Sequence, residues 1–502
     1  MEGLQGSLVL GFGVALTPMN LLYCLLGVSL GTLIGVLPGI GPVATIAMLL
    51  PATFSLPPVS ALIMLAGIYY GAQYGGSTTA ILVNLPGESS SVVTCLDGYA
   101  MARQGRAGPA LGIAALGSFF AGCVSTLLIA LFAPPLADVA LRFGPAEYFS
   151  LMVLGLVAAA VLSRGSLTKA IAMIFFGLLL GLVGADVNSG AFRFTFGIPE
   201  LADGIGFVVV AMGMFGFAEI IANLEHPEQR QVFTSHVSGL MPTRADLRQS
   251  WKAVLRGTGV GSFFGILPGG GAILASFAAY TVEKRVAADP SRFGNGAIEG
   301  VAGPEAANNA GAQTSFIPLL TLGIPSNAVM ALMIGAMTIH GITPGPEVMT
   351  KQPELFWGMI ASMWIGNLML VVLNLPLIGL WVGLLRVPYR LLYPAILLFS
   401  CIGVYSLNNN AFDVILTGAF GLLGYALLKL GCEPAPMLLG FVLGPLMEEY
   451  LRRALRISRG DPTIFVTRPL SLALLAGAAF LLFVLVVVPI VKRQAPLRAD
   501  AR

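Results

Sequence analysis

The sequence is poor in charged residues. Of its 502 residues, 10% are Asp, Glu, Lys or Arg and 56% are hydrophobic, with a formal net charge of +3 and a mean hydropathy of +0.87. This composition excludes an ordinary soluble protein and indicates an all-α, polytopic membrane protein. No run of basic residues is present of the kind that follows a phosphate backbone, so the sequence predicts no nucleic-acid partner.

Cysteine and histidine are also scarce. The five cysteines show no C-x-x-C spacing, so we interpret them as small apolar residues and not as a metal site or a disulfide framework. The three histidines form no H-E-x-x-H motif, and neither a G-x-G-D nor a G-x-S-G motif is present. A membrane-embedded enzyme is therefore the remote alternative, and we expect no catalytic residues and no cofactor.

One interrupted apolar stretch occurs twice. Gly31–Gly41, GTLIGVLPGIG, returns 230 positions later as Gly261–Gly271, GSFFGILPGGG, which indicates an internal duplication. Proline lacks an N–H donor and glycine tolerates unusual backbone conformations, so a helix that enters the Leu-Pro-Gly-X-Gly unit should end there. Paired breaks of this kind in two halves of a membrane protein predict a transporter binding site.

A second break motif also occurs in both copies. NLPGES at Asn84–Ser89 corresponds to LGIPSN at Leu322–Asn327, with Pro86 matched to Pro325. The offset between the copies here is 239, so the second copy contains a net insertion of nine residues between its two breaks. The break motifs thus lie at 37–41 and 84–89 in the first copy, and at 267–271 and 322–327 in the second.

The breaks divide the apolar sequence into segments of unequal length. Since a spanning helix needs about 20 apolar residues, we expect about ten to twelve spans with shorter re-entrant pieces between them. Residues 58–71 and 72–85 are expected as two pieces, and Pro134-Pro135 is expected to form a turn.

The long hydrophilic segment 223–256 predicts a linker between the copies. We expect a first membrane repeat at 1–222 and a second at 257–447. Residues 448–502 are expected to hold a basic loop, a final transmembrane helix and the C-terminal tail.

The breaks are the candidate substrate site. A broken helix presents unpaired N–H groups and a partial positive charge, which suit a carboxylate without a buried arginine. The candidate substrate-binding residues, which form the breaks or lie beside them, are Pro38, Gly39, Gly41, Ser77, Thr78, Thr79, Asn84, Pro86, Gly87, Ser89, Gly269, Gly270, Gly271, Pro325, Ser326 and Asn327.

A polar cluster in the second copy is the candidate cation site. An ionisable group at membrane depth is a functional candidate, and adjacent asparagines in an apolar run are costly without partners. The predicted cation-coupling residues are Glu305, Asn308, Asn309, Gln313 and Thr314, with a Na⁺ site near the two asparagines. The sequence leaves open whether Na⁺ or H⁺ is the coupling ion.

Several alternatives stay open at this point. Small residues in membrane helices also serve close packing. Glu88, Asp97 and Glu299 either act at the breaks or are solvated loop carboxylates, and Glu219 stands alone in an apolar span. A passive anion channel also uses broken helices, so it is a second candidate function.

Two long strings resemble a known family. YGGSTTAILVNLPGESSSVVTCLDGYAMARQGRAG, at 74–108, and EGVAGPEAANNAGAQTSFIPLLTLGIPSN, at 299–327, closely resemble the large membrane subunit of tripartite tricarboxylate transporters, the TctA family. The likeness covers nearly the whole chain. It implies a multi-pass permease of the bacterial inner membrane that takes up a dicarboxylate or tricarboxylate by cation symport.

The resemblance also implies partners and an architecture. The partners would be a small four-helix membrane subunit and a periplasmic solute-binding protein. The architecture would be that of elevator-type carriers, which contain two inverted repeats with re-entrant hairpin tips at the substrate.

Overall fold

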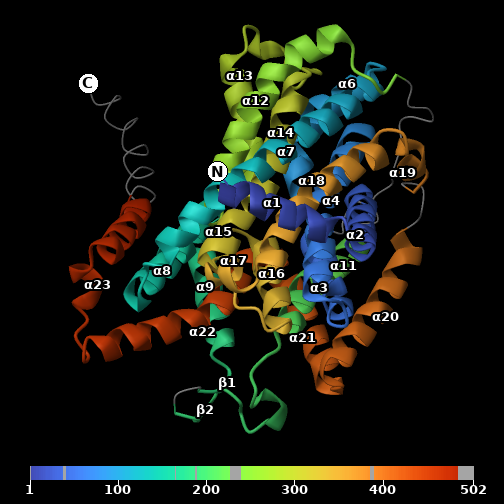
Figure 1. Ribbon diagram of the computed structural model, residues 1–502. Helices are drawn as coiled ribbons and strands as arrows, with labels where there is room; N and C mark the ends of the chain where they lie inside the picture. Colours follow the sequence, from blue (N-terminus) through green and yellow to red (C-terminus); the bar gives the residue numbers. More distant parts are fainter. Residues whose placement is uncertain are drawn as a thin grey trace, which may run out of the picture. The chain divides into compact units, whose positions relative to one another are not determined.

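The computed structural model of the chain describes residues 2–37, 41–163, 166–186, 189–225, 239–384 and 389–483 (Figure 1). Its regular structure is helical apart from one antiparallel sheet, in which β1 (Gly184–Ala185) pairs with β2 (Phe192–Arg193). The prediction of an all-α protein is therefore confirmed, with this short hairpin as the exception.

Apolar helices are numerous in the described part of the chain. Five are long and apolar enough to cross a membrane: Pro18–Val36, Ala107–Ala140, Pro145–Leu162, Pro353–Asn374 and Ala411–Lys429. Shorter apolar helices are Gly3–Ala15, Pro42–Thr53, Leu167–Gly181, Phe207–Ala222, Ala328–Ile339 and Pro469–Phe483. The chain is a multi-pass membrane protein.

The chain forms two compact units. Unit 1 contains Met1–Ala140 and Gly206–Lys429, and unit 2 contains Leu141–Ile205 and Leu430–Arg502. Both copies of each break motif belong to unit 1. The division into repeats at 222, 256 and 447 stays a prediction.

Unit 1 holds most of the helices. Its first part contains α1 (Glu2–Ala15), α2 (Pro18–Val36), α3 (Pro42–Thr53), α4 (Pro58–Val83), η1 (Ser89–Ser91), α5 (Val92–Thr94), η2 (Cys95–Tyr99), α6 (Ala100–Arg103) and α7 (Ala107–Ala140). Its second part contains α10 (Phe207–Ala211), η4 (Met212–Phe217), α11 (Ala218–Glu225), α12 (Arg244–Ile266), α13 (Gly271–Val286), η5 (Pro290–Arg292), α14 (Glu299–Thr314), α15 (Phe316–Leu322), α16 (Ala328–Ile339), α17 (Glu347–Lys351), α18 (Pro353–Asn374), α19 (Ile378–Leu384), α20 (Tyr389–Asn408) and α21 (Ala411–Lys429).

Unit 2 joins two distant parts of the sequence. It contains α8 (Pro145–Leu162), α9 (Leu167–Gly181), the hairpin, η3 (Pro199–Leu201), α22 (Pro434–Ile457), α23 (Ile464–Thr467) and the helix Pro469–Phe483. Two ion pairs connect the hairpin region to α22, Arg452 with Asp186 at 2.8 Å and Arg193 with Glu448 at 2.9 Å.

Two predicted interruptions are wrong. Residues 58–83 form one continuous helix, α4, and α7 runs through Pro134 and Pro135. In an apolar environment an open loop leaves more backbone groups unpaired than a proline inside a helix does, so the helix continues.

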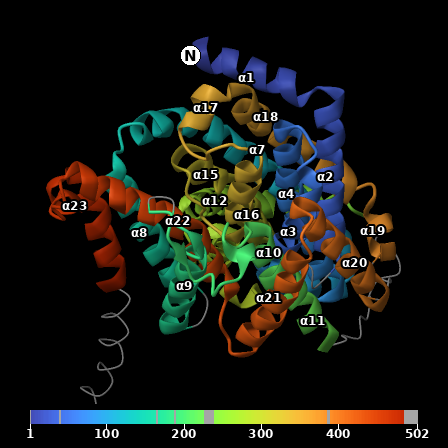
Figure 2. The ribbon, with the colours of Figure 1, turned by 90° about the horizontal axis from the view of Figure 1, so that it is seen from below.

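Two buried helices form the centre of unit 1. Every residue of α4 from Ser60 to Val83 is buried, and so is every residue of α14 from Gly300 to Thr314. Helix α2 packs beside α4, as the two views show, and α12 packs beside α14 (Figures 1 and 2). The helix that enters each first break therefore lies along a central helix.

Candidate functional site

Glycines bring the helices of the first pair together. Gly27, Gly31 and Gly35 on α2 are spaced by four residues, so they lie on one face of the helix. A Cβ at these positions would overlap the carbonyl oxygens of α4 at Met64, Ile68 and Ala72, in that order. The two backbones can approach this closely because glycine has no side chain.

The second pair repeats this contact. Gly257, Gly261 and Gly265 on α12 lie against the carbonyl oxygens of α14 at Gly303, Ala307 and Gly311. The glycines are 230 positions after their counterparts, and the carbonyls are 239 positions after theirs. The offset of 239 therefore extends along the whole central helix, and the nine-residue insertion lies between Gly265 and Gly303.

The central helices also end alike. Asn84 ends α4 and Gly323 ends α15, which continues from α14, and both have left-handed backbone, with φ of 60° and 70°. Four residues later, Glu88 caps η1 by accepting a hydrogen bond from the Ser90 N–H at 3.1 Å. Its counterpart Asn327 caps α16 by accepting one from the Met330 N–H at 3.1 Å.

Each second break reaches the central helix of the other copy. The side-chain amide of Asn308, on α14, donates to the Glu88 carboxylate at 3.3 Å. The amide of Asn327 donates to the Tyr69 hydroxyl, on α4, at 3.4 Å. Asn308 and Tyr69 are counterparts at the 239 offset, so the two contacts are equivalent.

Glu305 lies where the copies meet. Its side chain is fully buried. One carboxylate oxygen accepts a hydrogen bond from the Ser77 hydroxyl of α4, and the other accepts one from the Thr94 hydroxyl of α5. None of the ion pairs found among the described residues includes Glu305. A carboxylate from the second copy is thus held by two neutral hydroxyls from the first.

The other predicted cation-coupling residues are all fully buried on α14. Asn308 contacts Ser90 and Glu88. Asn309 donates to the Ser118 hydroxyl of α7 at 2.7 Å, but its own side-chain oxygen has no hydrogen-bond partner. Neither polar atom of the Gln313 side chain has a partner either, whereas Thr314 bonds to its own helix backbone. Unpartnered buried amides are costly in a purely structural core.

The predicted substrate residues of the first copy differ in their surroundings. Ser77 bonds to Glu305, Thr78 is buried, and Thr79 donates to the Val36 carbonyl at the end of α2. Asn84 and Ser89 are exposed, and Pro86 is half-buried. Gly87 is buried, and a Cβ there would overlap the Gly35 carbonyl, which explains the glycine. Pro38 and Gly39 lie outside the described residues.

The remaining end of the first break is Gly41, the N-cap of α3. Its backbone N–H donates to the carboxylate of Glu219, on α11. Glu219, which stands alone in the sequence, therefore has a partner at a helix N-terminus, where a negative charge is stabilised.

In the second copy the two breaks touch. The Gly269 N–H donates to the Ser326 carbonyl at 2.7 Å, and Gly271 lies beside Asn327. Ser326 and Pro325 are buried, and Gly270 is buried at the start of α13. The second-copy breaks are thus in contact with each other, and Asn327 connects them to α4.

Several polar residues at this centre were not predicted. Thr94 bonds to Glu305, Ser118 bonds to Asn309, and the Ser90 hydroxyl lies 2.8 Å from the Gln73 side-chain oxygen. Mapping Asn308 through the 239 offset would have indicated Tyr69. Nothing comparable in the sequence marks the others, because hydroxyl residues are also common in helix packing.

The sequence left the roles of three carboxylates undecided, and two of them, Glu88 and Asp97, are not solvated. Glu88 is 8% exposed. Asp97 is fully buried, and one of its oxygens accepts hydrogen bonds from the N–H groups of Gly294, Gly296 and Ala297, each at 2.8 Å. These three residues lie in the segment between Gly265 and Gly303 that contains the insertion, so Asp97 links this segment to the first copy. Glu299 is half-buried and pairs with Arg292.

Comparison with known proteins identifies the family. The family model described as the tripartite tricarboxylate transporter TctA family matches residues 21–439. An uncharacterised 52.8 kDa protein of Agrobacterium vitis, from the TAR-I ttuC' 3' region, is 63% identical over 476 residues, which are 95% of each chain. Another uncharacterised protein of that organism, from the TAR-II ttuC' 3' region, is 64% identical over 234 residues, which are 47% of this chain and 96% of that protein.

No solved structure matches the chain. The match of the family model over most of the length and the high identity to the full-length relative agree with the motifs at 74–108 and 299–327. The chain therefore belongs to the tripartite tricarboxylate transporter TctA family.

Proposed function

We propose that the chain is the large permease subunit of a tripartite transporter, which takes up a dicarboxylate or tricarboxylate by cation coupling across the bacterial inner membrane. A periplasmic binding protein would deliver the substrate, and a small four-helix membrane subunit would complete the complex. The family supports a transporter that works with partner subunits.

The observation that carries the proposal is the position of Glu305. Its buried carboxylate belongs to one copy and its two hydrogen-bond donors, Ser77 and Thr94, belong to the other. A charge buried without a salt bridge is costly, so binding of Na⁺ or H⁺ would neutralise it and change the contact between the copies. That link would couple the cation to substrate binding.

The broken helices supply a place for the substrate carboxylate. Their N-terminal N–H groups are held by side chains of the chain itself, by Asn327 at α16 and by Glu219 at α3. A substrate carboxylate that binds there would displace one of these caps, and the neighbouring Ser326 and Gly271 would line it. We also propose that the copies are inverted repeats and that they act as an elevator-type carrier.

Uptake into proteoliposomes with the partner subunits tests the function. We expect Glu305→Gln to abolish coupled uptake, because an amide neither binds a cation by charge nor takes up a proton. The matched control is Glu354→Gln, which changes an exposed glutamate at the start of α18 and should leave uptake unchanged. Wild-type uptake with unchanged ion dependence in Glu305→Gln would contradict the role of Glu305.

The same vesicles separate a carrier from a channel. A coupled carrier accumulates the carboxylate against its own gradient when an ion gradient is imposed, whereas a channel only lets the carboxylate equilibrate. Accumulation driven by a Na⁺ or H⁺ gradient supports the carrier. Equilibration alone, under every gradient, would identify a passive anion channel.

A further inference from the structure

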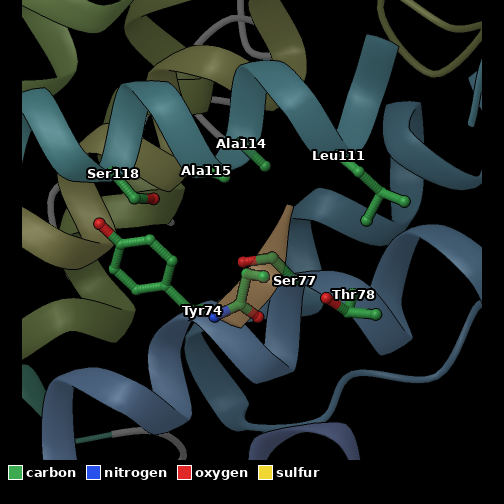
Figure 3. A pocket seen from close by; sticks show the side chains of 8 residues that line it. Tyr74, Ser77, Thr78, Leu111, Ala114, Ala115 and Ser118 are labelled. Carbon is green, nitrogen blue, oxygen red and sulfur yellow. The ribbon is translucent and has the colours of Figure 1, made fainter. Parts of the chain in front are cut away.

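A small cavity with a mixed polar and apolar lining lies between α4 and α7 (Figure 3). Its volume is about 10 Å³, which is the space of about one water molecule. The lining residues are Tyr74, Ser77, Thr78, Leu111, Ala114, Ala115, Ser118 and Asn374. Figure 3 shows Tyr74, Ser77 and Thr78 of α4 on one side of this space and Ser118, Ala115, Ala114 and Leu111 of α7 on the other.

Asn374, at the end of α18, contributes an unpartnered oxygen. The side chain is 4% exposed. Its amide nitrogen donates to the Leu370 carbonyl at 3.0 Å and lies 3.5 Å from the Thr32 hydroxyl, whereas its oxygen has no hydrogen-bond partner. A buried amide oxygen without a donor costs free energy. A hydrogen-bond donor or a cation beside this oxygen would therefore stabilise the fold.

Three hydroxyls of the lining direct their protons elsewhere. Ser77 donates to the Glu305 carboxylate, Ser118 to the Glu305 backbone carbonyl at 3.4 Å, and Tyr74 to the Asn367 side-chain oxygen at 3.4 Å. A hydroxyl has one proton and two lone pairs. What these three groups can offer a ligand in the cavity is therefore acceptor oxygen.

The lining offers more acceptor oxygens than donors, which favours a cation. A carboxylate would meet the acceptor oxygens of Asn374, Ser77 and Ser118, with the Thr78 hydroxyl as the one donor left among the lining hydroxyls. A water molecule could donate two hydrogen bonds, but among the lining hydroxyls only that of Thr78 is left to donate to its two lone pairs. Hard cations bind several oxygen ligands, and the carboxylate that Ser77 contacts, that of Glu305, balances one positive charge.

We propose that this cavity binds the coupling cation, a monovalent ion of the size of Na⁺, through oxygens of Tyr74, Ser77, Ser118 and Asn374. The inference rests on the proposed function, since it assigns the ion of that coupling. Ser77 touches both the cavity and Glu305, so an ion in the cavity lies one hydroxyl away from the carboxylate that joins the two copies. Asn374 and Ser118 thereby become ion ligands outside the break motifs.

Thermal unfolding of the purified full-length chain in nanodiscs tests the site. The probe is NaCl, with choline chloride added to keep the ionic strength constant. A ligand that binds the folded state raises Tm in a saturable way, so we expect Na⁺ to raise the Tm of the wild type with a measurable half-effect concentration. Asn374→Leu should raise that concentration at least 10-fold.

A matched control separates ion binding from stability. Asn20 is also a buried asparagine, but its oxygen already accepts a hydrogen bond from Ser60 at 2.6 Å. Asn20→Leu should lower Tm equally in Na⁺ and choline and leave the half-effect concentration unchanged. If Asn374→Leu does not fold, Ser118→Ala removes another ligand oxygen with a smaller change, and it should raise the concentration at least 3-fold.

The possible outcomes decide the question. No effect of Na⁺ on the wild type would overturn the inference, as would an unchanged half-effect concentration in the variant that folds. Uptake that runs on a proton gradient alone in Na⁺-free vesicles would also overturn it, while the proposed function would stand. Equilibration without accumulation under every gradient would refute the proposed function, and the Na⁺ effect on Tm would still report on the cavity.

Discussion

The two central helices, α4 and α14, share a scaffold and differ in chemistry. Both receive a row of glycines from the preceding helix at corresponding carbonyls. Both lead to a residue with left-handed backbone, then to a break with a capping side chain. Yet the positions of Glu305, Asn308, Asn309 and Gln313 on α14 are those of Ala66, Tyr69, Tyr70 and Tyr74 on α4.

This difference separates the features that the shared backbone requires from those that one copy alone contains. Close helix packing needs small residues at the same places in both copies, so these positions match. The polar groups occur once, where α14 meets the hydroxyls of α4 and α5. The tyrosines of α4 fill corresponding positions with large rings, and two of their hydroxyls contact side chains of the second copy, Asn327 and Asn367.

The largest effect should come from filling the glycine contacts. Gly31→Ala and Gly261→Ala both place a Cβ against a backbone carbonyl, so the two helices of each pair must move apart. We expect each substitution to lower the free energy of unfolding by about 2–3 kcal/mol, as overpacking does. Equal losses in the two copies, measured by thermal or denaturant unfolding, would support an equivalent scaffold.

Gly259→Ala is the control for this pair. Gly259 is on the same helix as Gly261, but a Cβ there would have nothing within 4 Å. The change should alter stability by less than about 1 kcal/mol, the difference in helix propensity between the two residues. If only Gly261→Ala destabilised the protein, and Gly31→Ala did not, the equivalence of the two pairs would be lost.

A smaller effect should distinguish the ends of the central helices. Gly323→Ala puts a Cβ on a residue with φ of 70° and against the Pro344 carbonyl, so we expect a loss of about 2 kcal/mol. Asn84→Gly keeps the left-handed backbone without strain and should change stability by less than about 1 kcal/mol. Comparison of Tm values measures both, and equal losses would show that the residue type at these ends is not set by the backbone.

The smallest effect should come from the starts of the entering helices. Helix α12 begins with a capping box, in which Thr243 and Asp246 bond to each other's backbone, and Arg106 pairs with Asp246. The N-cap of helix α2 is Thr17, whose side chain makes no capping hydrogen bond. We expect Asp246→Asn to cost about 1 kcal/mol and Thr17→Ala to cost less than half of that.

The pH dependence sharpens this prediction. Burial disfavours the charged form of Asp246, but the hydrogen bonds from Thr243 and the Arg106 charge outweigh it and hold the pKa of this carboxyl below its usual value of 3.8. A carboxyl with a lowered folded-state pKa stabilises the protein fully above about pH 4, and the effect is lost as the pH falls through the lowered pKa. The Tm difference between wild type and Asp246→Asn should therefore shrink below about pH 4. A constant difference down to pH 2 would contradict this explanation.

The sequence indicated the repeat and the breaks, and it marked Glu305 as a buried carboxyl that needs partners. Those predictions rest on local chemistry, since proline and glycine end helices and a carboxyl in an apolar run needs partners. The predicted interruptions at residues 71–72 and at Pro134-Pro135 were wrong. A helix in a buried or apolar environment keeps its hydrogen bonds there despite residues that favour turns. The sequence also missed Thr94, Ser118 and Asn374, whose types are common in membrane helices.

Composition and repetition by themselves determined that this is a membrane protein with two copies of a broken-helix motif. Only the tertiary structure decided which residues of one copy meet those of the other. The hydrogen bonds of Glu305 with Ser77 and Thr94 join residues 228 and 211 positions apart. Such contacts depend on how α4, α5 and α14 pack, and no local pattern of residues encodes the distance between their side chains.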